Sequence, residues 1–186
     1  MMMARLHIFL ILVLCIKITI VCGATVIPVH FWLYTVDNLE EFEDMEFDGA
    51  KVHLNSDTMF DPRKPTKLVA HGWGGGTHID MIFAVAYARA GVDYNVIGVD
   101  WRDMEGKAQE QVVMVGEYAA HFVEALVMDH GLKLEDVHPI GWSYGAHVVG
   151  RVIVTILLVI TVSFRSEYWE RDKQRRPRQA EKDHCS

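Results

Sequence analysis

Cysteine is scarce in this sequence: the 186 residues contain only three, Cys15, Cys22 and Cys185. Two of them lie in the apolar N-terminal segment and one lies near the C-terminus, so no disulfide framework can close between residues 24 and 150. A domain in that region must therefore be held together by its core. The apolar content of 51% at 23% charge is ordinary for a globular protein, and the length allows one such domain.

Basic residues are also few. Between residues 24 and 150 there are 20 Asp and Glu against eight Lys and Arg, and the densest acidic stretch is Glu40–Glu46. This balance argues against nucleic acid as a partner. The acidic stretch lacks metal-ligand spacing and is expected to be a solvated loop, and the histidines are scattered, so no metal site is predicted. Gly74–Gly76 lacks the Lys and Ser or Thr of a phosphate-binding loop, so no nucleotide cofactor is predicted either.

The N-terminal apolar run, Ile8–Ile16, is too short to span a bilayer. It follows Arg5, is closed by Lys17 and leads to small residues at positions 22 to 24. This pattern predicts a secretory signal peptide over residues 1–23, cleaved near Gly23 or Ala24, and therefore an extracellular protein. A membrane anchor is the alternative, and the shortness of the run disfavours it.

Strand and helix patterns alternate along the middle of the chain. Extended segments are expected at 26–34 and 51–54, strands at 67–70, 95–101 and 137–140, and helices at 79–90 and 105–130, the last closed by Gly131. Such alternation predicts an α/β fold, with a mostly parallel sheet covered by helices on both faces and an antiparallel edge at its beginning. Active residues are then expected at the carboxyl ends of the strands, where Trp73, Asp100 and Ser143 lie. Of these, Asp100 is expected to orient the sheet end rather than to react.

Five residues, Gly141-Trp142-Ser143-Tyr144-Gly145, follow the last predicted strand. The G-x-S-x-G pattern is typical of a strained strand-to-helix turn that exposes a serine nucleophile, and its glycines avoid collisions with the neighbouring strand and helix. A second strand ends in the glycine-rich loop His71–Gly76, whose backbone N–H groups can stabilise an oxyanion. Together the two motifs predict serine hydrolase chemistry at Ser143.

Four segments resemble the secreted pancreatic-type lipases, most closely the arthropod members: Phe31–Thr35, Val69–Trp73, Val99–Trp101 and Val137–Gly150. The resemblance covers residues 25 to 150 and implies an α/β-hydrolase fold. It also implies that Ser143 is the nucleophile, and that the backbone N–H groups of Trp73 and Tyr144 form the oxyanion hole. The implied substrate is a fatty acyl ester of a glyceride or phospholipid, met at a lipid–water interface.

Three positions depart from the family pattern. Trp142 and Tyr144 stand where His and Leu are usual, and Pro139 interrupts the strand before the serine. Because proline has no N–H to donate to the hydrogen bonds of a central strand, Pro139 is expected to disturb the geometry just before the nucleophile elbow, the G-x-S-x-G turn.

The catalytic partners of Ser143 are not found in the sequence. In α/β-hydrolases the chain order is Ser, acid, His, so both partners must follow Ser143. His147 would have to fold back against its own helix, and Glu167 and His184 lie in a segment without the family's pattern. The domain, residues 24–150, is therefore expected to be truncated after the nucleophile elbow and inactive as it stands. The alternative function is a non-catalytic lipid- or protein-binding module.

After Gly150 the resemblance stops, and residues 151–186 form an atypical apolar run followed by an Arg-rich tail. The run Val152–Phe164 has three interpretations: a buried strand, a short membrane span, or translated sequence that belongs to no fold. Its 13 uncharged residues give about 20 Å as a helix, short of the ~30 Å hydrocarbon core, so a stable span is not expected. We favour the third interpretation, an incomplete or misread gene product.

Overall fold

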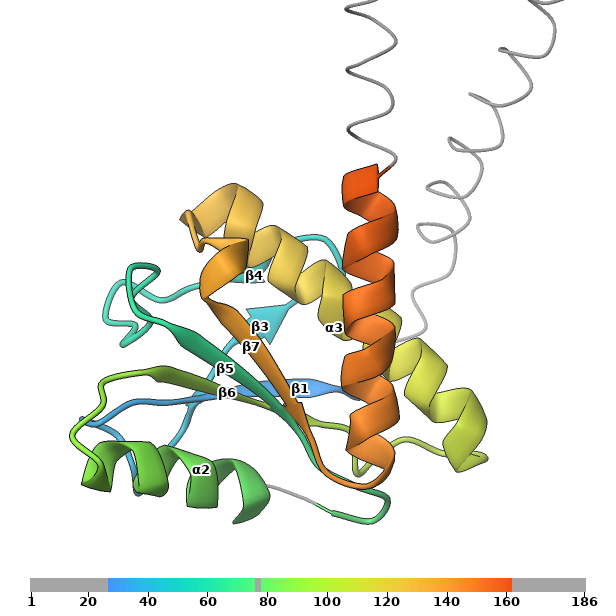
Figure 1. Cartoon of the computed structure of the whole chain (residues 1–186), viewed down its shortest axis with the longest axis horizontal. Helices are drawn as coiled ribbons and strands as arrows, with labels where there is room; N and C mark the ends of the chain where they lie inside the picture. Colours follow the sequence, from blue (N-terminus) through green and yellow to red (C-terminus); the bar gives the residue numbers. More distant parts are fainter. Residues whose placement is uncertain (1–26, 76–77, 162–186) are drawn as a thin grey trace, which may run out of the picture.

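A five-stranded sheet lies at the centre of the computed structural model, which describes residues 27–75 and 78–161 (Figure 1). The strand order is β2-β1-β6-β5-β7. The strands are β1 His30–Tyr34, β2 Glu43–Asp44, β5 Thr66–Ala70, β6 Asn95–Asp100 and β7 Val137–Gly141. A separate hairpin pairs β3 Glu46–Phe47 with β4 Val52–His53. The predicted signal peptide, residues 1–23, lies outside the described residues.

The sheet is mixed rather than mostly parallel. β5 pairs in parallel with both β6 and β7, whereas β1 pairs antiparallel with β6 and β2. A helix separates β5 from β6 and another separates β6 from β7, and such crossovers are what parallel neighbours require. No helix lies between β1 and β2, so that pair is joined by a short loop and runs antiparallel. The antiparallel pairing at the beginning of the chain is as expected from the sequence, but it forms a larger share of the sheet than predicted.

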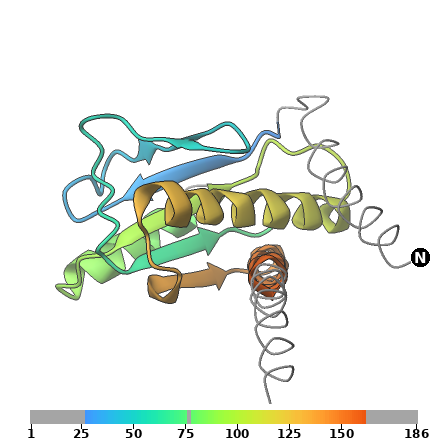
Figure 2. The same ribbon diagram turned by 90° about the horizontal axis from the view of Figure 1, so that it is seen from above.

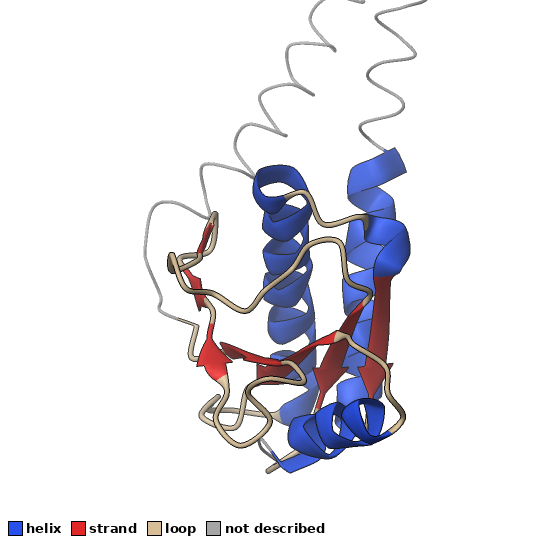
Figure 3. Cartoon of the chain, turned by 90° about the vertical axis from the view of Figure 1, so that its left-hand side faces the viewer, coloured by secondary structure: helices blue, strands red, loops and turns tan. Residues whose placement is uncertain are grey.

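In the described part of the chain, three α-helices cover the two faces of the sheet. They are α2 His78–Arg89, α3 Ala108–His130, and the Tyr144–Thr161 helix that follows β7. The α2 helix packs on one face, and the other two pack on the opposite face (Figures 1 and 3). A short 3-10 helix, Leu134–Asp136, leads into β7. α3 ends at Gly131, which has a φ of 78°, as predicted; it begins three residues late, because Gly106 has a φ of 110° that a helix does not accept.

Successive residues of the central strands point into two separate cores. Phe31, Leu68, Ile97 and their alternate neighbours pack with α3 and the Tyr144–Thr161 helix in the larger core. The intervening residues pack with α2 in the smaller one: Trp32, Tyr34, Val69 and Val96. This alternation is the period of two that a strand imposes on its side chains. Burial on both faces explains why β6 is buried at each of its six positions.

The apolar run after Gly150 is helical. The Tyr144–Thr161 helix continues without interruption through the described part of that run, residues 152–161, so the strand interpretation is wrong. Val148, Val149 and Val152 are buried in the larger core, and they hold the first turns of the helix in place. Tertiary packing thus overrides the strand preference of β-branched residues. Val152 and Ile156 pack on the larger core, so this part of the run belongs to the fold. The incomplete or misread gene product stays a prediction.

Beyond Val152 the same helix exposes apolar side chains. Ile153, Val154, Leu157 and Leu158 are between 45% and 59% exposed. By length and composition alone, this helix is the one described segment that could cross a membrane, with a mean hydropathy of 1.8 and 22% of it buried. Core helices of soluble proteins share this length and composition.

The Tyr144–Thr161 helix crosses α3 at a glycine. Figure 2 shows α3 lengthwise and the Tyr144–Thr161 helix end-on. A Cβ atom on Gly116 of α3 would lie 2.5 Å from Arg151 Cβ and 2.8 Å from the Val148 carbonyl oxygen. The crossing is therefore possible only because Gly116 has no side chain, and the adjacent Glu117 forms an ion pair with Arg151.

We expect Gly116→Ala to lower the free energy of unfolding by roughly 1 to 3 kcal/mol, because the added methyl group forces the two helices apart. Gly150→Ala is the matched control, since its Cβ would meet no atom within 4 Å. This control is expected to raise stability by up to about 1 kcal/mol through helix propensity alone. Urea unfolding of both variants checks the pair, and equal effects would contradict the close crossing.

Candidate active site

Ser143 lies in a strained turn between β7 and the helix that begins at Tyr144. Its φ is +54°, and among the described residues it is the only non-glycine residue with a positive φ. A side chain in this region costs about 1 to 2 kcal/mol, and such strain persists where the surrounding structure enforces it. Ser143 is exposed, so the turn presents its hydroxyl to solvent at the carboxyl end of β7.

The two glycines of the motif are required by contacts. A Cβ on Gly145 would lie 2.0 Å from the Ala70 carbonyl oxygen, at the end of β5. A Cβ on Gly141 would lie 2.4 Å from the Gly145 carbonyl oxygen. Both distances are far inside van der Waals contact. The steric reason predicted for the G-x-S-x-G spacing is therefore confirmed: one glycine faces the neighbouring strand, and the other faces the helix.

Pro139 does not disturb the turn, contrary to the expectation from sequence. Within the described residues β7 pairs only with β5, and Trp142 N–H donates to Ala70 O at 3.0 Å. Backbone N–H groups alternate in direction along a strand. The N–H of Ile140 therefore also points towards β5, as that of Trp142 does, and the backbone nitrogen of Pro139 points to the outer edge of the sheet. The missing N–H of Pro139 thus removes no bond to β5, in agreement with the edge positions that proline tolerates.

The glycine-rich loop after β5 lies against the elbow. A Cβ on Gly72 would be 3.1 Å from Ser143 Cβ and 3.3 Å from Trp142 O. The loop turns at once, because Gly75 N–H donates to Gly72 O at 3.0 Å and Gly74 takes a φ of 65°. Trp73 occupies the second position of this turn, and the turn does not use its N–H. Tyr144 is the first residue of its helix, so its N–H has no acceptor within the helix.

Behind this loop lies a buried polar cluster. His71 Nδ1 lies 2.7 Å from Gly72 O, and its Nε2 lies 2.9 Å from Asp100 Oδ1 at the end of β6. Arg102 donates to the same carboxylate through its backbone N–H and through Nε. Burial raises the pKa of Asp100, but these hydrogen bonds from His71 and Arg102 and the Arg102 charge outweigh it, so the pKa lies below its usual value. Asp100 orients the sheet end, as expected.

No catalytic base is in place among the described residues. Within them, no histidine or carboxylate side chain forms a hydrogen bond with the Ser143 hydroxyl, and His71 is fully buried and bonded elsewhere. His147 is exposed, and its ring lies 6.0 Å from that of Tyr144. Glu167 and His184 fall outside the described residues.

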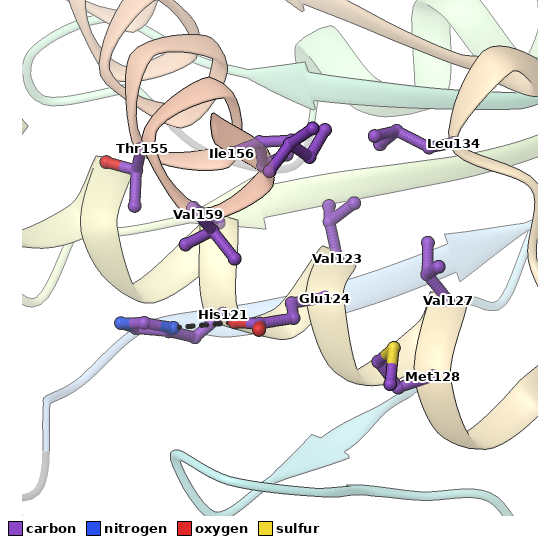
Figure 4. Close-up of a pocket in the computed structure, with 11 residues that line it drawn as sticks. His121, Val123, Glu124, Val127, Met128, Leu134, Thr155, Ile156 and Val159 are labelled. Atoms are coloured by element: carbon purple, nitrogen blue, oxygen red, sulfur yellow. Dashed lines mark hydrogen bonds and ion pairs between the residues drawn. The ribbon is translucent and has the colours of Figure 1, made fainter. Parts of the chain in front are cut away.

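An apolar pocket lies away from Ser143. It has a volume of about 290 Å³ and lies between α3 and the outer part of the Tyr144–Thr161 helix (Figure 4). Its walls are mostly aliphatic, and its polar pair is His121 and Glu124, 3.2 Å apart. Close to the serine along the chain or in the loop that packs against it, Trp142 and Trp73 have exposed side chains. Neither the sequence pattern nor the chemistry of its lining assigns the pocket to the site.

A buried carboxyl group beneath the site was not singled out by the sequence. Asp80, in the first turn of α2, is fully buried, and neither carboxylate oxygen has a hydrogen-bond partner among the described residues. It fits because β6 has Gly98 at this point, where a Cβ would lie 2.2 Å from Asp80 Oδ2. Burial, and then the Asp100 charge, raise the pKa of Asp80 to about 8, against the opposing effect of Arg102.

Comparison with known proteins finds one family. The family model described as Lipase matches residues 17–156, which extends past the Gly150 boundary expected from the sequence. The chain is 30% identical over 126 residues to pancreatic triacylglycerol lipase of Homo sapiens, covering 65% of this chain and 26% of the relative. It is 29% identical over 129 residues to the same lipase of Sus scrofa, covering 67% and 28%. A putative endothelial lipase of Crotalus adamanteus is 28% identical over 132 residues, covering 67% and 26%. The chain thus spans about a quarter of the length of these curated relatives.

Replacing the strained serine is expected to stabilise the protein. Ser143→Gly relieves about 1 to 2 kcal/mol of backbone strain and adds about 0.4 to 1 kcal/mol of unfolded-state entropy, for a net gain of roughly 0.5 to 1 kcal/mol. Ser56→Gly is the control, because Ser56 is exposed and its φ is negative, and it is expected to destabilise. Thermal and urea unfolding compare the two, and a loss of stability in Ser143→Gly would contradict the strain.

The Asp80 carboxyl group predicts a pH-dependent stability. Because its pKa is raised on folding to about 8, the folded chain binds the proton more tightly, and that stability is fully present below about pH 4. It is lost as the pH rises towards 8. We expect Asp80→Asn to flatten this slope and to raise the free energy of unfolding at pH 8 by about 1 kcal/mol or more. Asp57→Asn, at an exposed turn, is the control and should leave the slope unchanged.

Proposed function

Because the chain belongs to the Lipase family, we propose that it carries the nucleophile of a lipid ester hydrolase, with Ser143 attacking the carbonyl carbon of a triacylglycerol or phospholipid. One observation carries the proposal: a serine at a φ of +54° between two sterically required glycines, beside a glycine-rich loop. A positive φ at a non-glycine residue is strained and persists only where the surrounding structure enforces it. It is the geometry in which a hydroxyl stands clear of the sheet for attack.

The oxyanion is stabilised by two backbone N–H groups in this proposal. Attack by Ser143 Oγ on the carbonyl carbon gives a tetrahedral intermediate whose negative oxygen needs donors. Trp73 and Tyr144 supply backbone N–H groups from the two segments that meet at Gly72 and Ser143. Each such donor lowers the barrier by about 3 to 4 kcal/mol when it is fixed before the reaction.

The aromatic surroundings of Ser143 support a lipid ester as the substrate. Trp73 is 52% exposed and Trp142 is 66% exposed, while the Tyr144 ring lies 6.4 Å from that of Trp73. Exposed aromatic rings at a boundary between protein and solvent are suited to an apolar chain with a polar end. This favours action at a lipid–water interface, and we propose an extracellular location with residues 1–23 as the signal peptide.

A His and an acid must complete the triad from outside residues 27–161. Without a base to accept its proton, a serine hydroxyl is a weak nucleophile at neutral pH. We therefore propose that residues 24–150 form the N-terminal part of the hydrolase domain and that the described residues alone do not turn over substrate.

Chemical rescue tests the nucleophile directly. The full chain is assayed for hydrolysis of p-nitrophenyl butyrate with increasing imidazole, beside Ser143→Ala, which reports the reaction of imidazole in solution. We expect an imidazole-dependent rate about tenfold or more above that of Ser143→Ala, because a base contributes 10²- to 10⁴-fold when positioned and less when free.

Equal rates in the two proteins, with both folded by circular dichroism, would reject Ser143 as a nucleophile. Retained binding to triolein droplets in that case supports the alternative, a non-catalytic lipid-binding module. His147→Ala serves as a second control, and we expect it to leave the rescued rate unchanged, because His147 is exposed and its ring lies 6.0 Å from that of Tyr144.

A further inference from the structure

We infer that His71 is a positioning residue: its imidazole fixes the direction of the Trp73 N–H through the peptide unit that Trp73 shares with Gly72. The inference rests on the proposed function, because that N–H is one of the two proposed oxyanion donors. The sequence marked His71 only as the start of the glycine-rich loop.

The argument begins with the planarity of the peptide unit. The carbonyl of Gly72 and the N–H of Trp73 belong to one rigid plane and point in opposite directions. Fixing the carbonyl therefore fixes the N–H. Gly72 O lies 2.7 Å from His71 Nδ1 and 3.0 Å from Gly75 N, so two donors hold it. Rotation of this plane would break both hydrogen bonds at once.

The neighbouring peptide unit is held from the end of β6. Trp101 Nε1 donates to the carbonyl of His71 at 3.1 Å. Both planes that flank Gly72 are thereby fixed, although glycine has the most conformational freedom of any residue. A side chain at position 72 would crowd the serine, because its Cβ would lie 3.1 Å from Ser143 Cβ. The site thus favours glycine at this point and restrains it by other means.

The imidazole itself has little freedom to move. It is fully buried, stacks on the Trp101 ring at 5.4 Å with an interplanar angle of 5°, and lies 2.9 Å from Asp100 Oδ1. Arg102 Nε holds the other oxygen of Asp100 at 2.7 Å. Gly72 O can only accept, so Nδ1 must carry a proton whatever the state of Nε2. An N–H held in advance of the reaction needs no reorganisation when the oxyanion forms.

Two substitutions separate the hydrogen bond to Gly72 from the rest of the cluster. In His71→Asn the amide nitrogen takes the place of Nδ1 and retains the donor to Gly72 O. In His71→Gln the side-chain amide takes the place of Nε2, beside Asp100 Oδ1 and the Trp101 backbone N–H that donates to Nε2 at 3.1 Å, and the donor to Gly72 O is lost. The two variants are matched in chemistry and differ in which end of the imidazole they replace.

Hydrogen exchange at Gly75 N–H is the readout, because this group donates to the same carbonyl oxygen. We expect exchange by NMR to quicken about tenfold or more in His71→Gln and to stay within about twofold of the parent in His71→Asn. Amides of β6, such as Val96, should be unchanged in both. Equal exchange at Gly75 in the two variants, or a rise at Gly75 matched by β6, overturns the inference.

The unmodified chain gives a second test that does not depend on how the variants fold. Its ¹⁵N spectrum should show a protonated Nδ1 on His71, and an unprotonated Nδ1 overturns the inference. Where imidazole rescue is observed, His71→Gln should lower kcat about tenfold or more with KM unchanged. A failed rescue together with fast Gly75 exchange in His71→Gln rejects the hydrolase and leaves the positioning of Trp73 N–H intact.

Discussion

The close approach of the elbow to the end of β5 is the constraint on which the rest of the structure depends. Gly145 lies so near the Ala70 carbonyl oxygen that a Cβ atom would stand 2.0 Å from it, and a Cβ atom on Gly72 would stand 3.1 Å from Ser143 Cβ. The first contact excludes a side chain, and the second leaves one little room. The turn must therefore be tight, its serine must take a positive φ, and the helix from Tyr144 must start directly above the sheet.

The parallel part of the sheet brings the remaining groups to this point. Because β5, β6 and β7 are parallel neighbours, their carboxyl ends share one edge, and His71, Asp100 and Ser143 follow from those ends. The crossover helices α2 and α3 make that arrangement possible, and Gly116 lets the Tyr144–Thr161 helix cross α3 closely enough to cover the larger core. Behind the loop, Trp101 donates to the His71 carbonyl and Asp100 accepts from the His71 ring, and these hydrogen bonds restrain a segment that its glycines would otherwise leave free.

Local patterns in the sequence predict much of this architecture. The long helix was predicted from its apolar spacing and the glycine that ends it, and the elbow was predicted from its two glycines. What could not be predicted depends on neighbours in space. Pro139 leaves the turn intact because its backbone nitrogen points away from β5, and that direction depends on the register between β7 and β5. The helix after Gly150 is held by buried valines whose β-branched character alone favours a strand. The burial of Asp80, which has no hydrogen-bond partner among the described residues, follows only from the packing of α2 on Gly98.

The backbone conformation of Ser143 in solution tests the account most directly. A nuclear Overhauser experiment on the folded chain compares the amide and α protons of Ser143, and the β protons of Ser143 with the α protons of Gly72. The account predicts a strong intraresidue signal, the signature of a positive φ, together with a cross-peak to Gly72. A weak intraresidue signal of the helical kind, without contact to Gly72, would contradict it, because the serine would then have neither the strain nor the neighbour from which its role is argued.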